Sequence, residues 1–228
     1  MKRIAPLVAG LCMGVSAWAA PFQNGSFESG SVVPCNTFNV AAGSTIITGW
    51  TVSAGNLDWL GSPPSCGWQP SQGAASLDMV GSVAGGIGGI QQTFDTVPGT
   101  SYVLSFDMAG NTGAPPVVKP LAVTINGVTT NFTFDTTGRT GLAMGWVTQS
   151  IAFVATGTSS TVNFVSDVSA AGGTLNAGAA LDNVRVGPAS GPVSTADIPL
   201  DWAHWAAMLG IVLASVVLLS RRRDSRFR

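Results

Sequence analysis

Short runs in which apolar and polar residues alternate recur through the middle of the chain. In the clearest run, 101–109, one face of the expected strand carries Tyr102, Leu104, Phe106 and Met108. Similar runs, separated by Gly, Pro, Asn and Ser, predict strands at 22–27, 45–52, 75–80, 89–95, 101–109, 121–125, 131–135, 146–155, 161–166 and 180–186. Because no long helical period lies between them, they predict an all-β fold, a β-sandwich of the jelly-roll type.

Two turn signals agree with this pattern. Asn126 and Gly127 stand between two strand-like runs, which is a strong signal for a two-residue hairpin. Pro98 and Gly99 predict a second turn between strands. The chain has no fixed repeat period, which disfavours a solenoid.

The first residues have the pattern of a secretory signal peptide. Lys2 and Arg3 precede an apolar run that ends near Val15, and small residues follow at 17–20. An uncleaved anchor is the alternative, although this run is shorter than the ~20 residues that span a bilayer. We therefore assign 1–19 to a signal peptide and 20–187 to the β-sandwich domain.

The last forty residues predict a linker and a membrane segment. Residues 188–197 are rich in Pro, Ser and Gly, as a flexible linker is. Residues 202–220 are nearly all apolar, and five Arg follow. This order predicts a transmembrane helix with a cytoplasmic basic end, which leaves the domain outside. The alternative is a buried C-terminal helix, although such helices are rarely apolar all round.

Charge narrows the expected partners. Only 9% of the 228 residues are charged, and the two end segments hold seven of the ten Lys and Arg. From 20 to 188 there are eight acidic and three basic residues, a net charge of −5. No basic patch is available to neutralise phosphates, so a nucleic-acid partner is disfavoured. Neutral sugars or a divalent cation fit this composition better.

The residue types also limit catalysis. The single His, His204, lies near the C-terminus, which excludes a Ser-His-Asp triad, a Cys-His dyad or a His-ligated zinc site in the main body. A glycosidase would have to use carboxylates alone, for example Asp58 with Asp78. No spacing singles out such a pair, so catalysis is not expected.

Cys35 and Cys66 are the two cysteines that remain after removal of the signal peptide. In an oxidising compartment such a pair is expected to form a disulfide. Closing a loop of about 30 residues would stabilise the fold by roughly 3–4 kcal/mol.

Aromatic residues are the candidates for sugar binding, because a ring face packs against the C–H face of a pyranose. Trp59 and Trp68 lie in or near a Gly/Pro/Ser-rich segment, and Asp58, Gln69 and Asn111 could donate or accept hydrogen bonds. The alternative is that Trp59 packs in the core or lines a loop.

A series of short segments resembles the choice-of-anchor C family, which is related to the DUF642 proteins of plant cell walls. The segments are 24–28 (NGSFE), 42–52 (AGSTIITGWTV), 57–59 (LDW), 73–79 (GAASLDM), 90–94 (IQQTF), 105–111 (SFDMAGN) and 179–186 (AALDNVRV). The resemblance covers about 22–187. It implies a galactose-binding-like jelly roll, outside the cytoplasm, associated with polysaccharide and without established catalysis.

The same resemblance implies a structural Ca²⁺ near the first and last strands. Glu28 and Asp182 stand there, and Asp107 or Asp78 could contribute further oxygen ligands, which are the ligands that Ca²⁺ takes. The alternative is that these carboxylates cap turns and accept backbone hydrogen bonds.

The C-terminal segment 198–228 resembles the IPTL-type sorting signals of exosortase-type enzymes in Gram-negative bacteria. Ile198, Pro199, Leu200 and Trp202 carry the resemblance, although the Thr that is usual in that motif is missing here. It implies an inner-membrane precursor whose helix is removed before delivery to the cell surface; the alternative is a permanent anchor. Together these features predict an exported surface protein that binds extracellular polysaccharide, with a structural or adhesive protein as the alternative.

Overall fold

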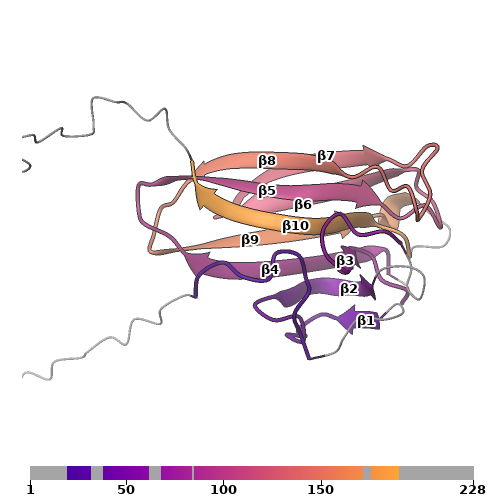
Figure 1. The fold of residues 1–228 in the computed structure, drawn as a ribbon, viewed down its shortest axis with the longest axis horizontal. Helices are drawn as coiled ribbons and strands as arrows, with labels where there is room; N and C mark the ends of the chain where they lie inside the picture. Colours follow the sequence, from indigo (N-terminus) through magenta and orange to yellow (C-terminus); the bar gives the residue numbers. More distant parts are fainter. Residues whose placement is uncertain (1–19, 32–37, 62–67, 84, 172–175, 190–228) are drawn as a thin grey trace, which may run out of the picture. The chain divides into compact units, whose positions relative to one another are not determined.

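The computed structural model describes residues 20–31, 38–61, 68–83, 85–171 and 176–189, all in the first of two compact units, 1–189 and 190–228 (Figure 1). The described part contains ten strands and one 3₁₀ helix, η1 (Ser169–Ala171). The strands are β1 (Phe38–Ala41), β2 (Thr51–Gly61), β3 (Ala75–Asp78), β4 (Ile87–Asp95), β5 (Ser101–Gly110), β6 (Val118–Ile125), β7 (Val128–Asp135), β8 (Val147–Val154), β9 (Ser159–Asp167) and β10 (Ala179–Pro188).

The strands form two antiparallel sheets that share β2. One sheet has the order β1-β2-β3-β10-β5-β8, and the other has the order β2-β4-β9-β6-β7. Side chains from both sheets meet in a single apolar cluster. The predicted all-β sandwich is therefore confirmed.

Strand β2 passes from one sheet to the other at a bend. Its first part pairs with β4 and its second part with β1 and β3, and the register with β4 shifts between Val52 and Ala54. At the bend Gly55 has a φ of +49°, and a Cβ there would lie 2.0 Å from the carbonyl oxygen of Ile87. Only glycine fits a backbone that is both left-handed and this close to its neighbour.

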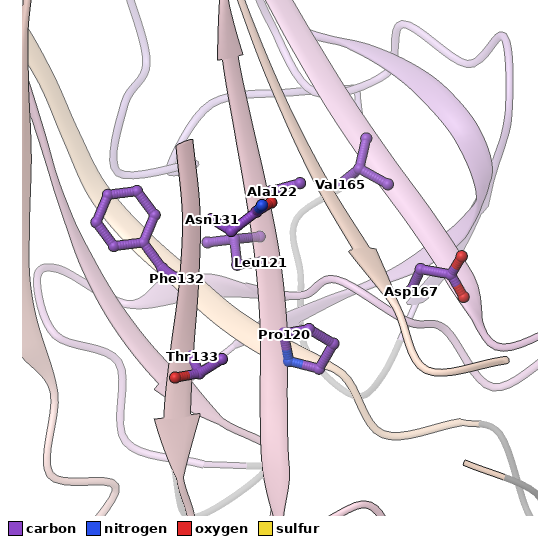
Figure 2. A pocket seen from close by; sticks show the side chains of 8 residues that line it. All are labelled: Pro120, Leu121, Ala122, Asn131, Phe132, Thr133, Val165 and Asp167. Atoms are coloured by element: carbon purple, nitrogen blue, oxygen red, sulfur yellow. The ribbon is translucent and has the colours of Figure 1, made fainter. Parts of the chain in front are cut away.

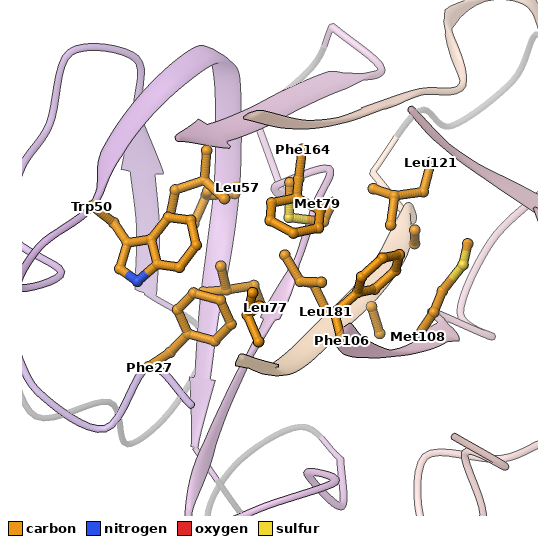
Figure 3. Close-up of a cluster of buried hydrophobic side chains, with 14 of the residues drawn as sticks. Phe27, Trp50, Leu57, Leu77, Met79, Phe106, Met108, Leu121, Phe164 and Leu181 are labelled. Carbon is orange, nitrogen blue, oxygen red and sulfur yellow. The ribbon is translucent and has the colours of Figure 1, made fainter. Parts of the chain in front are cut away.

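Aromatic rings link the two sheets across the core (Figure 3). Phe106 of β5 packs edge-on against Phe164 of β9 and Phe132 of β7, with ring centroids 5.2 Å apart in each case. Trp50 lies 5.3 Å from Phe27 and 6.2 Å from Phe164. These rings join the long N-terminal segment before β2 to the same core.

Eight of the ten predicted strands have counterparts from β3 onward, and both predicted turns are confirmed. Asn126 and Gly127 have φ values of 48° and 84°, which a type I′ hairpin turn requires. Gly99 has a φ of 77°, and the N–H of Thr100 donates to the carbonyl of Val97. Pro98 and Gly99 therefore sit where a type II turn needs them.

The prediction was wrong near the N-terminus. No strand forms at 22–27, because Asn24 and Phe27 have left-handed φ values of 52° and 60°. The Asn24 side chain bonds to the backbone of Ser29 and Thr48 and so holds this segment as a turn. The predicted strand at 45–52 starts instead at Thr51, and β1 was not predicted.

Several predicted features lie outside the described residues. They are the signal peptide 1–19, the Cys35–Cys66 disulfide, and the sorting motif of Ile198, Pro199, Leu200 and Trp202 with the apolar segment 202–220. Within the described ranges, no helix is long and apolar enough to cross a membrane.

Truncation of a core ring tests this packing. Phe164→Ala should lower the free energy of unfolding by about 3–5 kcal/mol, because Phe164 is fully buried between two aromatic neighbours. Val128→Ala, at a site that is 73% exposed, should change it by less than about 0.5 kcal/mol. Urea unfolding of both variants measures this, and equal effects would contradict the assigned core.

Candidate functional site

The two tryptophans predicted to stack on a sugar lie in the core. Trp59 is fully buried and donates its Nε1–H to the carbonyl of Phe27 at 2.9 Å. Trp68 is 4% exposed and donates to Ser76 Oγ at 2.7 Å. Neither ring has a face open to a ligand. Core packing, the alternative given above for Trp59, describes both tryptophans: Trp59 lies on β2 and Trp68 in the segment before β3, and both belong to the same buried cluster.

Asp58 also lies inside the fold. It is 4% exposed and accepts hydrogen bonds from Asn39 Nδ2 and from the backbone N–H of Ser82. It stands directly across from Asp78 in the β2–β3 register. Asp58 and Asp78, the two carboxylates named for a carboxylate-only glycosidase, are thus neighbours. Both are engaged in hydrogen bonds inside the fold, and neither lines the hollow on the outer face of β6, β7 and β9.

A buried polar cluster joins the ends of β3, β5, β6 and β10. Asp78 accepts from Asn111 Nδ2 at 2.6 Å and from the N–H groups of Val80 and Gly178. Lys119 is fully buried and donates its ammonium to the carbonyls of Ala114 and Ala177. Asn111, predicted as a ligand contact, therefore belongs to this internal cluster.

Burial sets the protonation of this cluster. Loss of hydration raises the pKa of Asp78 to about 7, although its three N–H donors oppose the shift. Burial lowers the pKa of Lys119, and the nearby Asp78 partly offsets this. The sequence did not single out Lys119 as a buried residue. It lies at alternate positions of β6 with the inward-facing Leu121 and Val123, and this alternation could have indicated that it points into the core.

A second group of carboxylates surrounds the loop before β3. Glu28 Oε1 accepts from the N–H groups of Ala74 and Ala75, and Asp182 Oδ2 accepts from those of Ser71 and Gln72. Asp107 accepts from Ser71 Oγ, Thr148 Oγ1 and Asn183 Nδ2. Glu28, Asp107 and Asp182, the residues named for a Ca²⁺ site, therefore all bond to the segment 71–75.

The two aspartates of this group differ in their pKa. Burial raises the pKa of Asp182 to about 7, against three backbone N–H donors, and Glu28 adds to the rise. At Asp107, burial also raises the pKa, but the three hydrogen bonds outweigh it and hold the pKa below its ordinary value. The difference follows from how deeply each carboxylate is enclosed.

The carboxylate oxygens of this group face N–H and O–H donors. Within the described ranges, no group of three or more His, Cys, Asp or Glu side chains is arranged to hold a metal ion. Calcium thus stays a prediction of the sequence. A rise in Tm on adding Ca²⁺, reversed by a chelator, would support it, and identical melting in both conditions would refute it.

The outer face of the β7-β6-β9 sheet carries a hollow of about 390 Å³ (Figure 2). Two rows of outward side chains line it, together with Leu121 and Phe132, which lie between the rows. Asn131, Ala122 and Val165 form one row across the three strands, as the register requires. Thr133, Pro120 and Asp167 form the next row. The hollow exists because Ala122 and Pro120 are short where neighbouring positions carry longer side chains.

The hollow is neutral apart from one carboxylate. Asp167, at one corner, bonds to the N–H and hydroxyl of Ser169, which lowers its pKa and keeps it ionised. The basic residues described lie elsewhere: Lys119 points into the core, and Arg139 and Arg185 lie in the turn after β7 and on β10. The floor is apolar and the rim carries amide and hydroxyl groups, which suits an uncharged polar ligand.

Comparison with known proteins identifies the family. The profile of the family described as "Protein of unknown function (DUF642)" matches residues 20–187. The chain belongs to the DUF642 family. The DUF642 domain is also 32% identical over 177 residues to halomucin of Haloquadratum walsbyi; the match covers 76% of this chain and 2% of halomucin. The chain thus spans a very small part of that relative's length.

Solved structures resemble the DUF642 domain distantly. TmCBM61, solved in complex with β-1,4-galactotriose, has a TM-score of 0.46 and 15% identity over 74% of this chain and 98% of its own. The xylan-binding domain CBM22-1 of Paenibacillus barcinonensis Xyn10C has a TM-score of 0.40 and 14% identity, over 69% and 97%. A family 35 carbohydrate-binding module from Clostridium thermocellum has a TM-score of 0.40 and 17% identity, over 65% and 97%.

The two raised pKa values predict an unusual pH dependence of the DUF642 domain. Asp78 and Asp182 titrate near pH 7 when folded and near 3.8 when unfolded. Between these values the folded state holds more protons, so the free energy of unfolding should fall as pH rises from 4 to 7. Denaturant unfolding across this range measures the slope.

Two variants show where the slope comes from. Asp78→Asn should make the slope shallower without abolishing it, because one of the two groups that take up a proton is gone and Asp182 remains. Asp135→Asn should leave the slope unchanged. Hydrogen bonds from Thr137 lower the pKa of Asp135, so this carboxylate affects the free energy of unfolding only below pH 4. A free energy of unfolding that rises from pH 4 to 7 in the unaltered protein would contradict the assignment.

Proposed function

We propose that this domain binds a neutral polysaccharide outside the cell, in the hollow on the outer face of β6, β7 and β9. The observation that carries the proposal is the composition of that hollow. Its floor is made of apolar side chains, its rim carries amide, hydroxyl and carboxylate groups, and it lies on the outer face of three paired strands. Sugars need this combination of apolar contact and several hydrogen bonds.

Each part of the hollow has a role in this proposal. Pro120, Ala122 and Val165 contact the C–H faces of the sugar rings. Asn131 donates and accepts hydrogen bonds with hydroxyl groups, and Asp167 accepts them. Phe132 lines the hollow and packs edge-on against Phe106, whereas Phe164 faces the core. Because the ring of Phe132 is half-buried, it offers little area for stacking, so binding is expected to be modest and to depend on several sugar contacts at once.

We place this domain on the cell surface. The signal peptide 1–19 would export it, and segment 198–228 would hold it in the inner membrane until an exosortase-type enzyme removes the helix. The tail motif and the choice-of-anchor C resemblance support this route. Binding without turnover is the activity proposed, because the buried Asp58 and Asp78 are enclosed by their hydrogen-bond partners.

Filling the hollow tests the binding proposal. Ala122→Leu should lower affinity for neutral polysaccharide at least tenfold, because the larger side chain occupies the floor. Ala152→Leu, an exposed alanine of β8 on the other sheet, is the matched control and should bind as the unaltered protein does. Affinity electrophoresis in galactan, xylan and soluble cellulose derivatives, with polygalacturonate as an anionic comparison, provides the measurement.

Two results would overturn the proposal. One is the absence of binding to every neutral polysaccharide, which would favour a structural or adhesive protein. The other is equal binding by Ala122→Leu and the unaltered protein.

An epitope tag placed after Arg228 tests the processing route. The mature surface protein should react with an antibody to the domain and should lack the tag, because the tail is removed with the helix. A full-length, tagged protein that persists in the envelope would instead show a permanent anchor.

A further inference from the structure

Carboxylates are the charged side chains that strands β7, β6, β9 and β4 turn outward. Asp135 on β7, Asp167 on β9 and Asp95 on β4 are all exposed. Lys119, the basic residue of these four strands, is fully buried and points into the core. The outer face of the four described strands is therefore negative wherever it is charged.

Asp167 is the carboxylate that lines the hollow, and Figure 2 shows it at one end of the lining residues. It follows Val165 by two positions on β9, so both side chains project from the same face of the sheet. The backbone N–H of Ser169 donates to its Oδ1 at 2.9 Å, and the Ser169 hydroxyl also bonds to it. These bonds lower the pKa of Asp167, so the carboxylate is charged at neutral pH.

An ionised carboxylate at this place affects neutral and acidic sugars in opposite ways. It accepts hydrogen bonds from the hydroxyl groups of a neutral sugar, and a charged acceptor forms stronger bonds than a neutral one. A uronic acid residue would bring its own carboxylate into the hollow, where the two like charges repel. For unit charges ~5 Å apart in water, this repulsion weakens binding by about fourfold.

Resting on the proposed function, we propose that Asp167 determines the specificity of the hollow: it favours neutral polysaccharides and excludes those that contain uronic acid residues. Asp135 adds to this exclusion from the next row of the sheet. It follows Thr133, another lining residue, by two positions on β7, a distance of about 7 Å.

Asp95 lies too far from the hollow to take part. It pairs with Ser159, which is about 27 Å from Asp167 along β9, at ~3.4 Å for each residue. In 0.15 M salt, interactions between exposed charges are largely screened beyond about 8 Å. The three carboxylates therefore give a series in which the effect on binding should fall with distance from the hollow.

Pairs of polysaccharides that differ mainly in charge test this specificity. β-1,4-Galactan and mixed-linkage β-glucan are each compared with the form in which the C6 hydroxyl groups have been oxidised to carboxylates, and arabinoxylan is compared with glucuronoxylan. The full chain in mild detergent is titrated calorimetrically at pH 7 and 0.15 M salt. In the pair that responds, the neutral member should bind at least fivefold more tightly.

Three variants that replace a carboxylate with an amide locate the source of the preference. Asp167→Asn should reduce the neutral-to-anionic affinity ratio at least threefold, and its amide keeps an acceptor oxygen for the Ser169 N–H. Asp135→Asn should reduce the ratio by a smaller factor. Asp95→Asn is the matched control, because it makes the same change in net charge, and it should leave the ratio unchanged.

The outcomes distinguish the two proposals. If no neutral polysaccharide binds, the proposed function fails. If a neutral polymer and its anionic counterpart bind equally well, the function stands and the role assigned to Asp167 is wrong. An equal loss of preference in Asp167→Asn and Asp95→Asn would also refute that role, because it would reflect the net charge of the domain.

Discussion

The close approach of β2 to β4 at Gly55 is the constraint on which the rest of this fold depends. Because residue 55 has no side chain and a left-handed backbone, β2 can bend beside Ile87 and leave one sheet for the other. The sandwich is closed along this side by a continuous strand. Trp50, just before this strand, packs against Phe164 of β9. Strand β4 pairs with β2 along one edge and with β9 along the other.

The fold uses its polar side chains in two different ways. Asp58, Asp78 and Asp182 are buried and accept hydrogen bonds from backbone N–H groups. These bonds tie loops to strands. Such carboxylates resemble catalytic or metal-binding groups in a sequence. On the outer face of β7, by contrast, Asn131 and Thr133 are exposed and line the hollow, where a ligand can reach them. Solvent exposure, more than residue type, therefore distinguishes the polar residues that stabilise the fold from those proposed to bind a ligand.

The sequence predicted the regular part of the fold well and the site poorly. Alternation is strong in β5 and β9, and the Asn126-Gly127 turn has a specific backbone requirement, so these elements were predictable. The N-terminal segment was not, because Asn24 forms local side-chain bonds that override the apolar pattern. For Trp59 the sequence left a ligand role and core packing both open, because a tryptophan in a Gly-rich context can be exposed or buried, and the structure shows it buried.

The hollow itself had no local signal in the sequence. Its residues come from three strands and are brought together only by register, and residues such as Pro120 and Ala122 carry no functional signal on their own. The parity of β6 could have shown that Pro120 and Ala122 face outward, opposite Lys119. A cross-strand row becomes visible only when the strand order is known.

A crystal structure of the protein with a bound neutral oligosaccharide tests the central claim most directly. The account predicts a sugar ring in the hollow on β6, β7 and β9, in contact with Pro120, Ala122 and Val165, and a hydroxyl group bonded to Asn131. Sugar density on the loops at the end of the sandwich, with this face of the sheet empty, would contradict it.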